Sequence, residues 1–244
     1  MKKRLDTILH EKYSEYSRRQ IQSWIMQGNV TVNKQVVTKA GIQVKTDDDI
    51  KLNKIDPKYV SRAGFKLEKA LQSFSLSVEG LVALDAGLST GGFADCLLQN
   101  GIKKIFGIEV GFGQTHEKIS SDDRVVVMEK TNLRYLESLP ELVDIVTLDL
   151  SFISVLLVME TIVKLIKKDG FLIVLIKPQF EAQKHQVGRG GIIKDSALHE
   201  EIVEKVVKGI VEYGFVCKGV IDSPILGTQG NKEFLACFEY NTIK

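Results

Sequence analysis

Length, composition and charge limit the kinds of protein that this chain can be. It has 244 residues, 44% of them hydrophobic, which is ordinary for a globular protein with one sizeable core and a small additional module. No apolar run approaches the ~18 residues of a membrane span, and the opening Met-Lys-Lys-Arg is not followed by an apolar segment with a cleavage site. We therefore expect a cytoplasmic protein without a membrane partner.

The charged residues and the cysteines narrow the class further. Residues 1–60 carry 12 Lys or Arg against 7 Asp or Glu, whereas residues 61–244 carry 21 against 24. A basic module joined to a mildly acidic one is typical of a protein whose first part contacts a polyanion. The three cysteines, Cys96, Cys217 and Cys237, form no CxxC pair, so we expect reduced thiols and no metal site.

The first fifty residues predict a small α+β module. Apolar residues at helical spacing indicate one helix beginning near Arg4 and a second beginning at Ser17. Alternating apolar and polar residues then predict two or more short strands between Val30 and Leu52. The predicted boundaries are 1–54 for the module, 55–60 for a charged linker and 61–244 for a second domain.

The layout RLD…SRRQIQSWIMQGNVTVN resembles the small RNA-binding domain first described in a ribosomal small-subunit protein. In that family the second helix lies along RNA, so the resemblance implies phosphate contacts from Arg18, Arg19 and Lys34. The RLD also resembles the catalytic aspartate motif of pseudouridine synthases. Because Asp6 lies inside the first predicted helix, we interpret it as a structural residue.

Beyond the linker, the pattern predicts a βα unit with a glycine-containing turn. An amphipathic helix begins near Ser61, and spacing alone would make its Lys66 an ordinary exposed lysine. A buried-looking strand at 81–86 then runs into a turn at 87–92 and an apolar helix at 93–99. The turn fits neither G-x-G-x-x-G nor a P-loop, so neither a dinucleotide nor a nucleoside triphosphate is favoured.

The turn and the next strand together predict a site for a nucleotide-like cofactor. Glycine tolerates positive backbone dihedral angles and lets the main chain approach a ligand, and Gly87, Gly91 and Gly92 all lie in this turn. Glu109 ends the second strand about 20 residues later, where a carboxylate can accept hydrogen bonds from both hydroxyls of a ribose. The alternative is a solvated carboxylate at a strand end.

Strands and helices alternate through the rest of the chain, which predicts a mostly parallel, doubly wound sheet of the Rossmann-like α/β class. Two closing strands joined by a loop without a helix must run antiparallel to each other. Strands are expected at 125–128, 143–149, 171–177, 215–221 and 233–240, and helices at 133–139, 154–167 and 200–213.

Seven motifs give the chain a specific resemblance to a known family. SRAGFKL, LDAGLSTGGFADCLL, IEVGFGQ, EKTNLR, DLSFIS, KPQFE and GNKEF are similar to the hemolysin A (TlyA) family over nearly the whole chain. The resemblance implies an RNA-binding module followed by an FtsJ-like ribose methyltransferase domain that uses S-adenosylmethionine, with ribosomal RNA as the expected partner. The chain departs from the family pattern at Ala63, Leu88 and Glu109, and Leu88 could crowd the cofactor turn.

The resemblance also carries functional residues over. It implies a catalytic tetrad of Lys66, Asp149, Lys177 and Glu233, in which Lys66 stabilises a developing alkoxide and the carboxylates orient the lysines and the hydroxyl. Lys177 is either the base or a charged orienting group, because desolvation would lower its pKa and the carboxylates would raise it. No metal is implied. The residues implied to bind the cofactor are Asp85, Gly87, Ser89, Thr90, Gly91, Gly92, Glu109 and Asn132.

Other functions are less well supported by the sequence. A non-catalytic RNA-binding protein that has retained the fold is the main alternative, and measured binding of the methyl donor would separate the two. Pore formation is disfavoured because the chain shows no membrane-spanning or strongly amphipathic secreted segment. Methylation of a base amino group is a less well supported function, because DLSF lacks the Asn/Asp-Pro-Pro-aromatic motif of the enzymes that carry it out.

Overall fold

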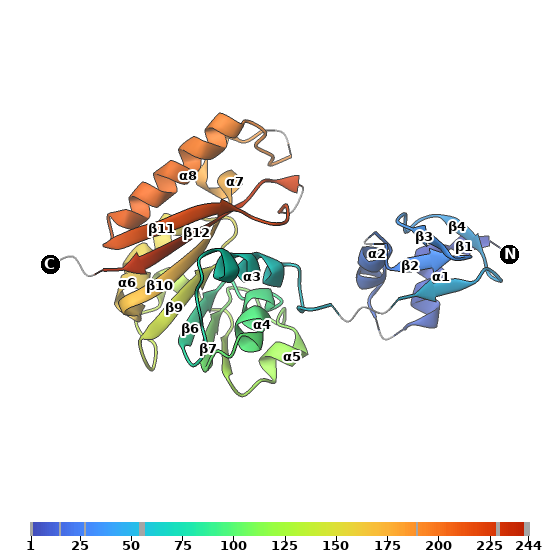
Figure 1. Cartoon of the computed structure of the whole chain (residues 1–244), viewed down its shortest axis with the longest axis horizontal. Coiled ribbons are helices and arrows are strands. Elements are labelled where there is room, and N and C mark those ends of the chain that lie inside the picture. The colour runs from blue at the N-terminus through green and yellow to red at the C-terminus, as the bar shows by residue number, and fades with distance from the viewer. Residues whose placement is uncertain are drawn as a thin grey trace. The chain divides into compact units, whose positions relative to one another are not determined.

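The computed structural model describes residues 2–14, 16–26, 28–53, 57–188, 190–227 and 230–241. The chain divides into two compact units, 1–58 and 59–244, each taken by itself below (Figure 1). Of the linker predicted at 55–60, residues 55 and 56 lie outside the described residues. Tyr59, which we assigned to the linker, is buried in the core of the second unit.

The first unit is a small α+β module with its own apolar core. Helices α1 (Leu5–Lys12) and α2 (Arg18–Met26) share this core with the strands. Ser17 opens α2 as expected, because its hydroxyl accepts from the Gln20 amide while the Gln20 side chain accepts from the Ser17 amide. The strands are β1 (Lys2–Arg4) paired with β4 (Gln43–Lys45), and an antiparallel sheet of β3 (Gln35–Val37), β2 (Val30–Val32) and β5 (Ile50–Leu52).

The second unit contains a seven-stranded sheet in the order β11-β12-β10-β9-β6-β7-β8. Strands β10, β9, β6, β7 and β8 run parallel, and β12 is antiparallel to both of its neighbours. The Rossmann-like class and the antiparallel closing strands are thereby confirmed. The strands are β6 (Val82–Ala86), β7 (Lys104–Ile108), β8 (Val125–Met128), β9 (Val143–Leu148), β10 (Ile166–Ile176), β11 (Phe215–Asp222) and β12 (Phe234–Tyr240).

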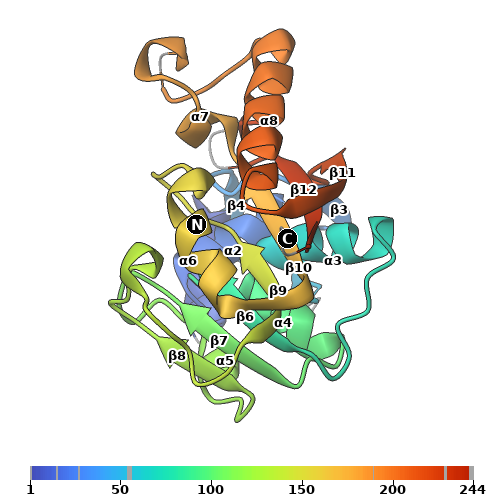
Figure 2. The ribbon, with the colours of Figure 1, turned by 90° about the vertical axis from the view of Figure 1, so that its left-hand side faces the viewer.

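Helices cover both faces of this sheet (Figures 1 and 2). Helices α3 (Ala63–Ser73), α4 (Gly92–Gln99) and α5 (Glu117–Ser120) share an apolar cluster with one face of the sheet. Helices α6 (Met159–Leu165) and α8 (Ser196–Val211) share the cluster on the opposite face. Successive residues of β10 enter the two clusters alternately, as the period of two along a strand requires. In the described ranges, none of the helices has the length and apolar character needed to cross a bilayer.

Two helices expected from the sequence are different in the structure. The one expected at 133–139 is only a 3-10 turn, η1 (Leu133–Tyr135), which ends at the extended backbone of Leu136. Leu133, Leu136 and Leu139 recur every third residue and all pack in the same apolar cluster, so their spacing mimics a helical pattern. The one expected at 154–167 is divided into η2 (Val155–Val158) and α6, and β10 begins at Ile166, earlier than expected.

Short elements after β10 were not expected from the sequence. Helix α7 (Pro178–Glu181) and the 3-10 turn η3 (Lys184–Gln186) follow the strand directly. Proline at the first helical position lacks only an amide that would have no partner in the helix, so it is compatible with this start. Four-residue helices are too short to give a clear hydrophobic period, which is why the sequence did not reveal α7 or α5.

Candidate active site

The topology of the second unit brings the expected site residues to one edge of the sheet. Parallel strands β6, β7, β9 and β10 are followed directly by Gly87, Glu109, Asp149 and Lys177. Ala86, the last residue of β6, is the register partner of the last residue of β7 and of the last residue of β9. The last residue of β10 pairs with the first of the antiparallel β12. Glu233, which precedes β12, therefore lies at the same edge. Open α/β sheets bind their ligands at this edge.

The four residues expected to be catalytic form two ion pairs. Lys66 Nζ lies 2.6 Å from Glu233 Oε2, and the two residues are only 8% and 3% exposed. Lys177 Nζ lies 2.7 Å from Asp149 Oδ1 and donates a hydrogen bond to Ser151 Oγ at 2.9 Å. Lys66 is therefore not the exposed helix lysine that spacing alone suggested, because α3 turns it toward the sheet.

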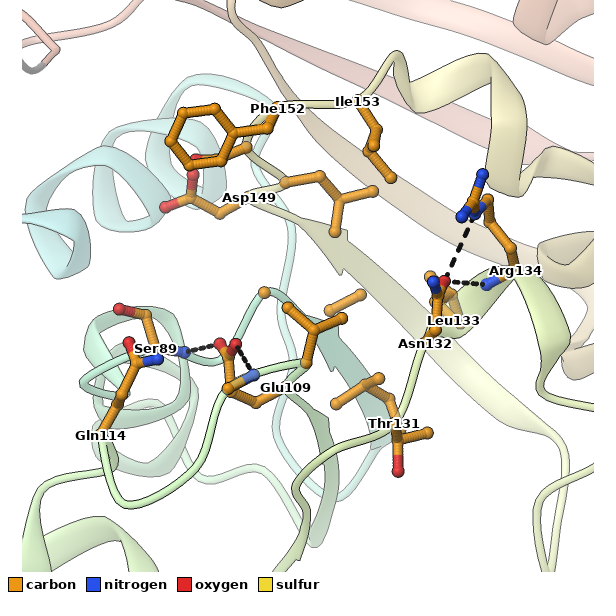
Figure 3. Close-up of a pocket in the computed structure, with 17 residues that line it drawn as sticks. Ser89, Glu109, Gln114, Thr131, Asn132, Leu133, Arg134, Asp149, Phe152 and Ile153 are labelled. Carbon is orange, nitrogen blue, oxygen red and sulfur yellow. Dashed lines mark hydrogen bonds between the residues drawn. The ribbon is translucent and has the colours of Figure 1, made fainter.

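A cavity of about 670 Å³ is lined by Asp149, the carboxylate of the second pair. In Figure 3, Asp149 and Phe152 lie across the cavity from Glu109 and Ser89. Its volume falls in the usual range for small-molecule sites, about 300–1,000 Å³. Of the expected cofactor residues, Gly87, Ser89, Glu109 and Asn132 line it, whereas Asp85, Thr90, Gly91 and Gly92 do not.

Glu109 joins the two loops that form one side of the cavity. Its Oε2 accepts from the Ser89 amide at 2.8 Å and its Oε1 accepts from the Gly111 amide at 2.7 Å (Figure 3). The residue is 7% exposed, which contradicts the alternative of a solvated strand-end carboxylate. Each carboxylate oxygen can accept more than one hydrogen bond, so both keep capacity for a ligand hydroxyl.

The glycine turn after β6 owes its glycines to packing between loops as well as to backbone conformation. Gly87 has a φ of +86°, and a Cβ there would lie 2.5 Å from the Asp149 carbonyl oxygen. Gly91 has a φ of +95°, but a Cβ there would meet the Ile119 side chain at 2.8 Å instead of entering the cavity. A side chain at Gly92 would collide with Ser61. Only Gly87 thus combines a cavity position with a close main-chain approach.

Leu88 does not crowd the cavity, contrary to the concern raised by its departure from the family pattern. It is buried in the cluster shared by α3 and α4. Its Cδ2 would lie 2.7 Å from a Cβ placed on Gly107 of the neighbouring strand, so the leucine fills the space that this glycine leaves. The structure therefore gives no reason to expect weakened donor binding from Leu88.

Asp85 lies behind the cavity wall and is 1% exposed. Thr147 Oγ1 donates to its Oδ1 at 2.7 Å, and its Oδ2 has no partner in the part of the chain that the structure describes. Burial raises the pKa of Asp85 to about 7, with Asp149 and Glu109 adding to the shift by charge repulsion. Asp85 is thus placed to support the wall and not to contact a ligand directly.

We expect the free energy of unfolding to fall less steeply with rising pH in Asp85→Asn than in the parent. The unfolded carboxyl ionises near pH 4 and the folded one near pH 7, so the folded state binds more protons between them and loses stability as pH rises. Between pH 5 and pH 8 the parent should lose roughly 2–3 kcal/mol of unfolding free energy through Asp85, at ~1.4 kcal/mol per pH unit. Urea unfolding at pH 5 and at pH 8 measures this change in unfolding free energy. Glu204→Gln, a change to an exposed carboxylate, is the control, and an unchanged slope in Asp85→Asn would contradict the prediction.

The residues expected to bind RNA lie in the first unit. Arg18 and Arg19 begin α2, Lys34 lies in the turn between β2 and β3, and all three are exposed. Arg18 Nη2 also donates to Asp6 Oδ2 at 3.2 Å. The buried Asp6 further accepts from Arg4 and Gln22, and these bonds, led by the one from Arg4, hold its pKa well below its usual range. Asp6 is thus a structural residue that joins the side chains of Arg4, Arg18 and Gln22 by hydrogen bonds, in line with its interpretation from the sequence.

Sequence reasoning did not identify several residues of the cavity. Ser151 and Phe152 line it from the DLSFIS motif, and Gln114 and Arg134 line it from IEVGFGQ and EKTNLR. All four lie inside motifs already recognised, so proximity to those motifs was the available signal. In the described ranges, no group of three or more His, Cys, Asp or Glu side chains is placed to hold a metal ion.

The fold and the site together define a Rossmann-like methyltransferase, with its antiparallel last strand and its cavity at the carboxyl edge of the sheet. The FtsJ-like methyltransferase family model matches residues 59–240 and the S4 domain model matches residues 3–50. The chain belongs to the hemolysin A (TlyA) family.

Individual relatives agree with this assignment. Hemolysin A of Brachyspira hyodysenteriae is 41% identical over 238 residues, covering 96% of this chain and 99% of the relative. The 16S/23S rRNA (cytidine-2'-O)-methyltransferase TlyA of Mycobacterium tuberculosis is 42% identical over 178 residues, covering 72% of this chain and 66% of the relative. A solved structure described as a candidate hemolysin from Streptococcus thermophilus has a TM-score of 0.78 at 40% identity, and the match covers 98% of this chain and 89% of that one.

Proposed function

We propose that this methyltransferase transfers a methyl group from S-adenosylmethionine to a ribose 2'-hydroxyl of ribosomal RNA, in the cytoplasm. The observation that carries the proposal is the position of Asp149. It lines the small-molecule cavity and also pairs with Lys177, so the cavity adjoins a lysine–carboxylate site. The relative from Mycobacterium tuberculosis, named for methylation of a cytidine 2'-hydroxyl in 16S and 23S rRNA, supports the substrate class.

The cavity residues fit S-adenosylmethionine. Glu109 can accept from the ribose hydroxyls while it retains its two backbone donors, and Gly87 leaves room for the main chain to approach a ligand. Asn132 lines the same cavity, and its Oδ1 accepts from the Arg134 amide at 3.1 Å, which fixes the side chain. The bound donor would supply an activated methyl group on a sulfonium, so the protein must position the hydroxyl and manage its proton.

The two ion pairs suggest how the chain manages the proton. A ribose hydroxyl is a poor nucleophile until its proton is removed or strongly hydrogen-bonded. Lys177 Nζ lies 2.7 Å from Asp149 Oδ1, so the lysine ammonium can donate to the hydroxyl oxygen while the Asp149 carboxylate accepts the hydroxyl proton. Lys66, held by Glu233, adds positive charge beside the developing alkoxide. The new C–O bond forms as the S–C bond breaks, and the proton passes from Asp149 to water.

Methyl-labelled donor incubated with the purified chain and with intact ribosomes or separated subunits tests the proposal. We expect label in the ribose of one or a few rRNA nucleotides, identified by digestion and mass spectrometry. A calorimetric titration of the chain with donor runs in parallel. Donor binding without label in any RNA, or no donor binding at all, would favour the alternative of a non-catalytic RNA-binding protein.

Changing Arg19 and Lys34 together to alanine should weaken RNA binding and flatten its dependence on salt. Each lost phosphate contact removes about one unit from the slope of log K against log salt, so the double variant should lose up to about two. Filter binding between low and moderate salt measures the slope. Lys3→Ala, whose amine pairs with Glu11, is the matched control. Arg18 is left in place because its loss would also disturb Asp6. An unaltered slope would remove both residues from the RNA contact.

A further inference from the structure

Helix α7 and the loop after β9 contact each other at successive points. We call residues 149–154 the β9–η2 loop. Lys177, immediately before α7, pairs with Asp149 and Ser151 at the beginning of this loop. Farther along, the rings of Phe180 and Phe152 lie 5.1 Å apart. The helix and the loop therefore run beside each other for their whole length, and the lysine–aspartate pair is one end of that contact.

Glu181 makes the contact at the other end. Its Oε2 accepts from Ser154 Oγ at 2.5 Å, and its Oε1 accepts from the Val155 amide at 2.8 Å. Glu181 is 5% exposed, and both of these partners are neutral. Lys205 of α8 donates to the Glu181 main-chain oxygen at 3.3 Å, which fixes the end of α7 from the other side. One buried carboxylate thus closes the β9–η2 loop onto α7.

Stability alone is a poor explanation for a carboxylate in this place. Burial raises the pKa of Glu181, which means that its charged form is disfavoured there relative to water. A desolvated charge contributes little net stability even when it is hydrogen-bonded, whereas it fixes the geometry of the groups that it joins. The groups joined here are the two segments that carry Lys177 and Asp149.

We propose that Glu181 is a positioning residue that holds the β9–η2 loop against α7 and thereby fixes the Lys177–Asp149 pair. The inference rests on the proposed function for its consequence, since the fixed pair is the one assigned to the proton. It assigns Glu181 no contact with the donor, because Glu181 does not line the cavity. A displacement of about 1 Å in a reacting group can lower a rate by roughly a hundredfold, so loosening this contact should be measurable.

Two substitutions at Glu181 separate positioning from charge. Glu181→Leu removes both acceptors and leaves the Val155 amide without its partner, so the β9–η2 loop should move away from α7. Glu181→Gln keeps one oxygen for the Val155 amide and offers an N–H to Ser154 Oγ, so it should retain the contact without the charge. The matched control is Glu204→Leu on the exposed side of α8.

Single-turnover methyl transfer at saturating donor and RNA is the first measurement. We expect Glu181→Leu to lower the rate by roughly tenfold to a hundredfold, and Glu181→Gln and Glu204→Leu to stay within about threefold of the parent. Donor affinity should change far less than the rate. If Glu181→Leu does not fold, Ser154→Ala, which removes one of the two hydrogen bonds, should still give a smaller loss of rate.

The NMR signal of the Lys177 Cε in protein labelled with ¹³C-lysine is the second measurement, assigned with Lys177→Arg. Its chemical shift should change in Glu181→Leu and not in Glu181→Gln. This result decides the inference even if the parent chain methylates no RNA, an outcome that would overturn the proposed function alone. A variant that loses unfolding free energy but keeps the parent Lys177 signal and rate would show that Glu181 is only structural, and the inference would be wrong.

Discussion

Lys177→Met is expected to lower methyl transfer at least a hundredfold while donor and RNA binding stay within about threefold of the parent. Methionine keeps roughly the volume of the lysine stem but removes the amine that pairs with Asp149 and donates to Ser151. Lys177 itself does not line the cavity, so the donor should lose no direct contact. Single-turnover rates with labelled donor measure the loss, and calorimetry measures the donor affinity.

Lys177→Arg distinguishes the two roles that the sequence left open. A guanidinium keeps the positive charge and can pair with Asp149, but it does not give up a proton in proteins. If Lys177 orients the hydroxyl as an ammonium, the arginine variant should keep partial activity; if Lys177 is the base, activity should be lost almost completely. A methionine variant that transfers methyl groups at the parent rate would remove Lys177 from the mechanism.

The edge of the sheet where the site lies could be predicted from the sequence. Asp149 and Lys177 each follow an apolar run, and the carboxyl ends of parallel strands meet at one edge. Which lysine pairs with which carboxylate could not be predicted, because the Lys66–Glu233 pair joins helix α3 to the residue before β12, 167 positions along the chain. Contacts between such distant positions depend on how the helices pack over the sheet, and no local pattern records that packing.

Side-chain direction in the cofactor turn was the other gap. Asp85 and Gly91 were both expected to bind the cofactor, yet neither lines the cavity. Asp85 is still inside β6, where every residue is buried, and Gly91 faces Ile119 of the short helix α5 that no pattern predicted. Glycine spacing identifies a turn of unusual backbone geometry, but the neighbour that each glycine accommodates is set by the tertiary structure.

Gly87→Ala is expected to lower donor affinity at least tenfold and to lower methyl transfer further. An alanine at a φ of +86° is strained by about 1–2 kcal/mol, and its Cβ would also lie 2.5 Å from the Asp149 carbonyl oxygen. A main-chain oxygen cannot rotate out of the way by itself, as the end of a flexible side chain can. The loop that carries Asp149 must therefore shift, and with it both the cavity wall and one member of the lysine pair.

Gly80→Ala is the matched control, because Gly80 has a similar φ of +72° but nothing lies within 4 Å of the added Cβ. Both variants should lose comparable unfolding free energy from backbone strain, whereas only Gly87→Ala should lose donor binding and activity. Calorimetric titration with the donor and single-turnover transfer measure the two effects. If Gly87→Ala binds the donor as tightly as Gly80→Ala does, the contact between the β6 turn and the Asp149 loop does not shape the donor site.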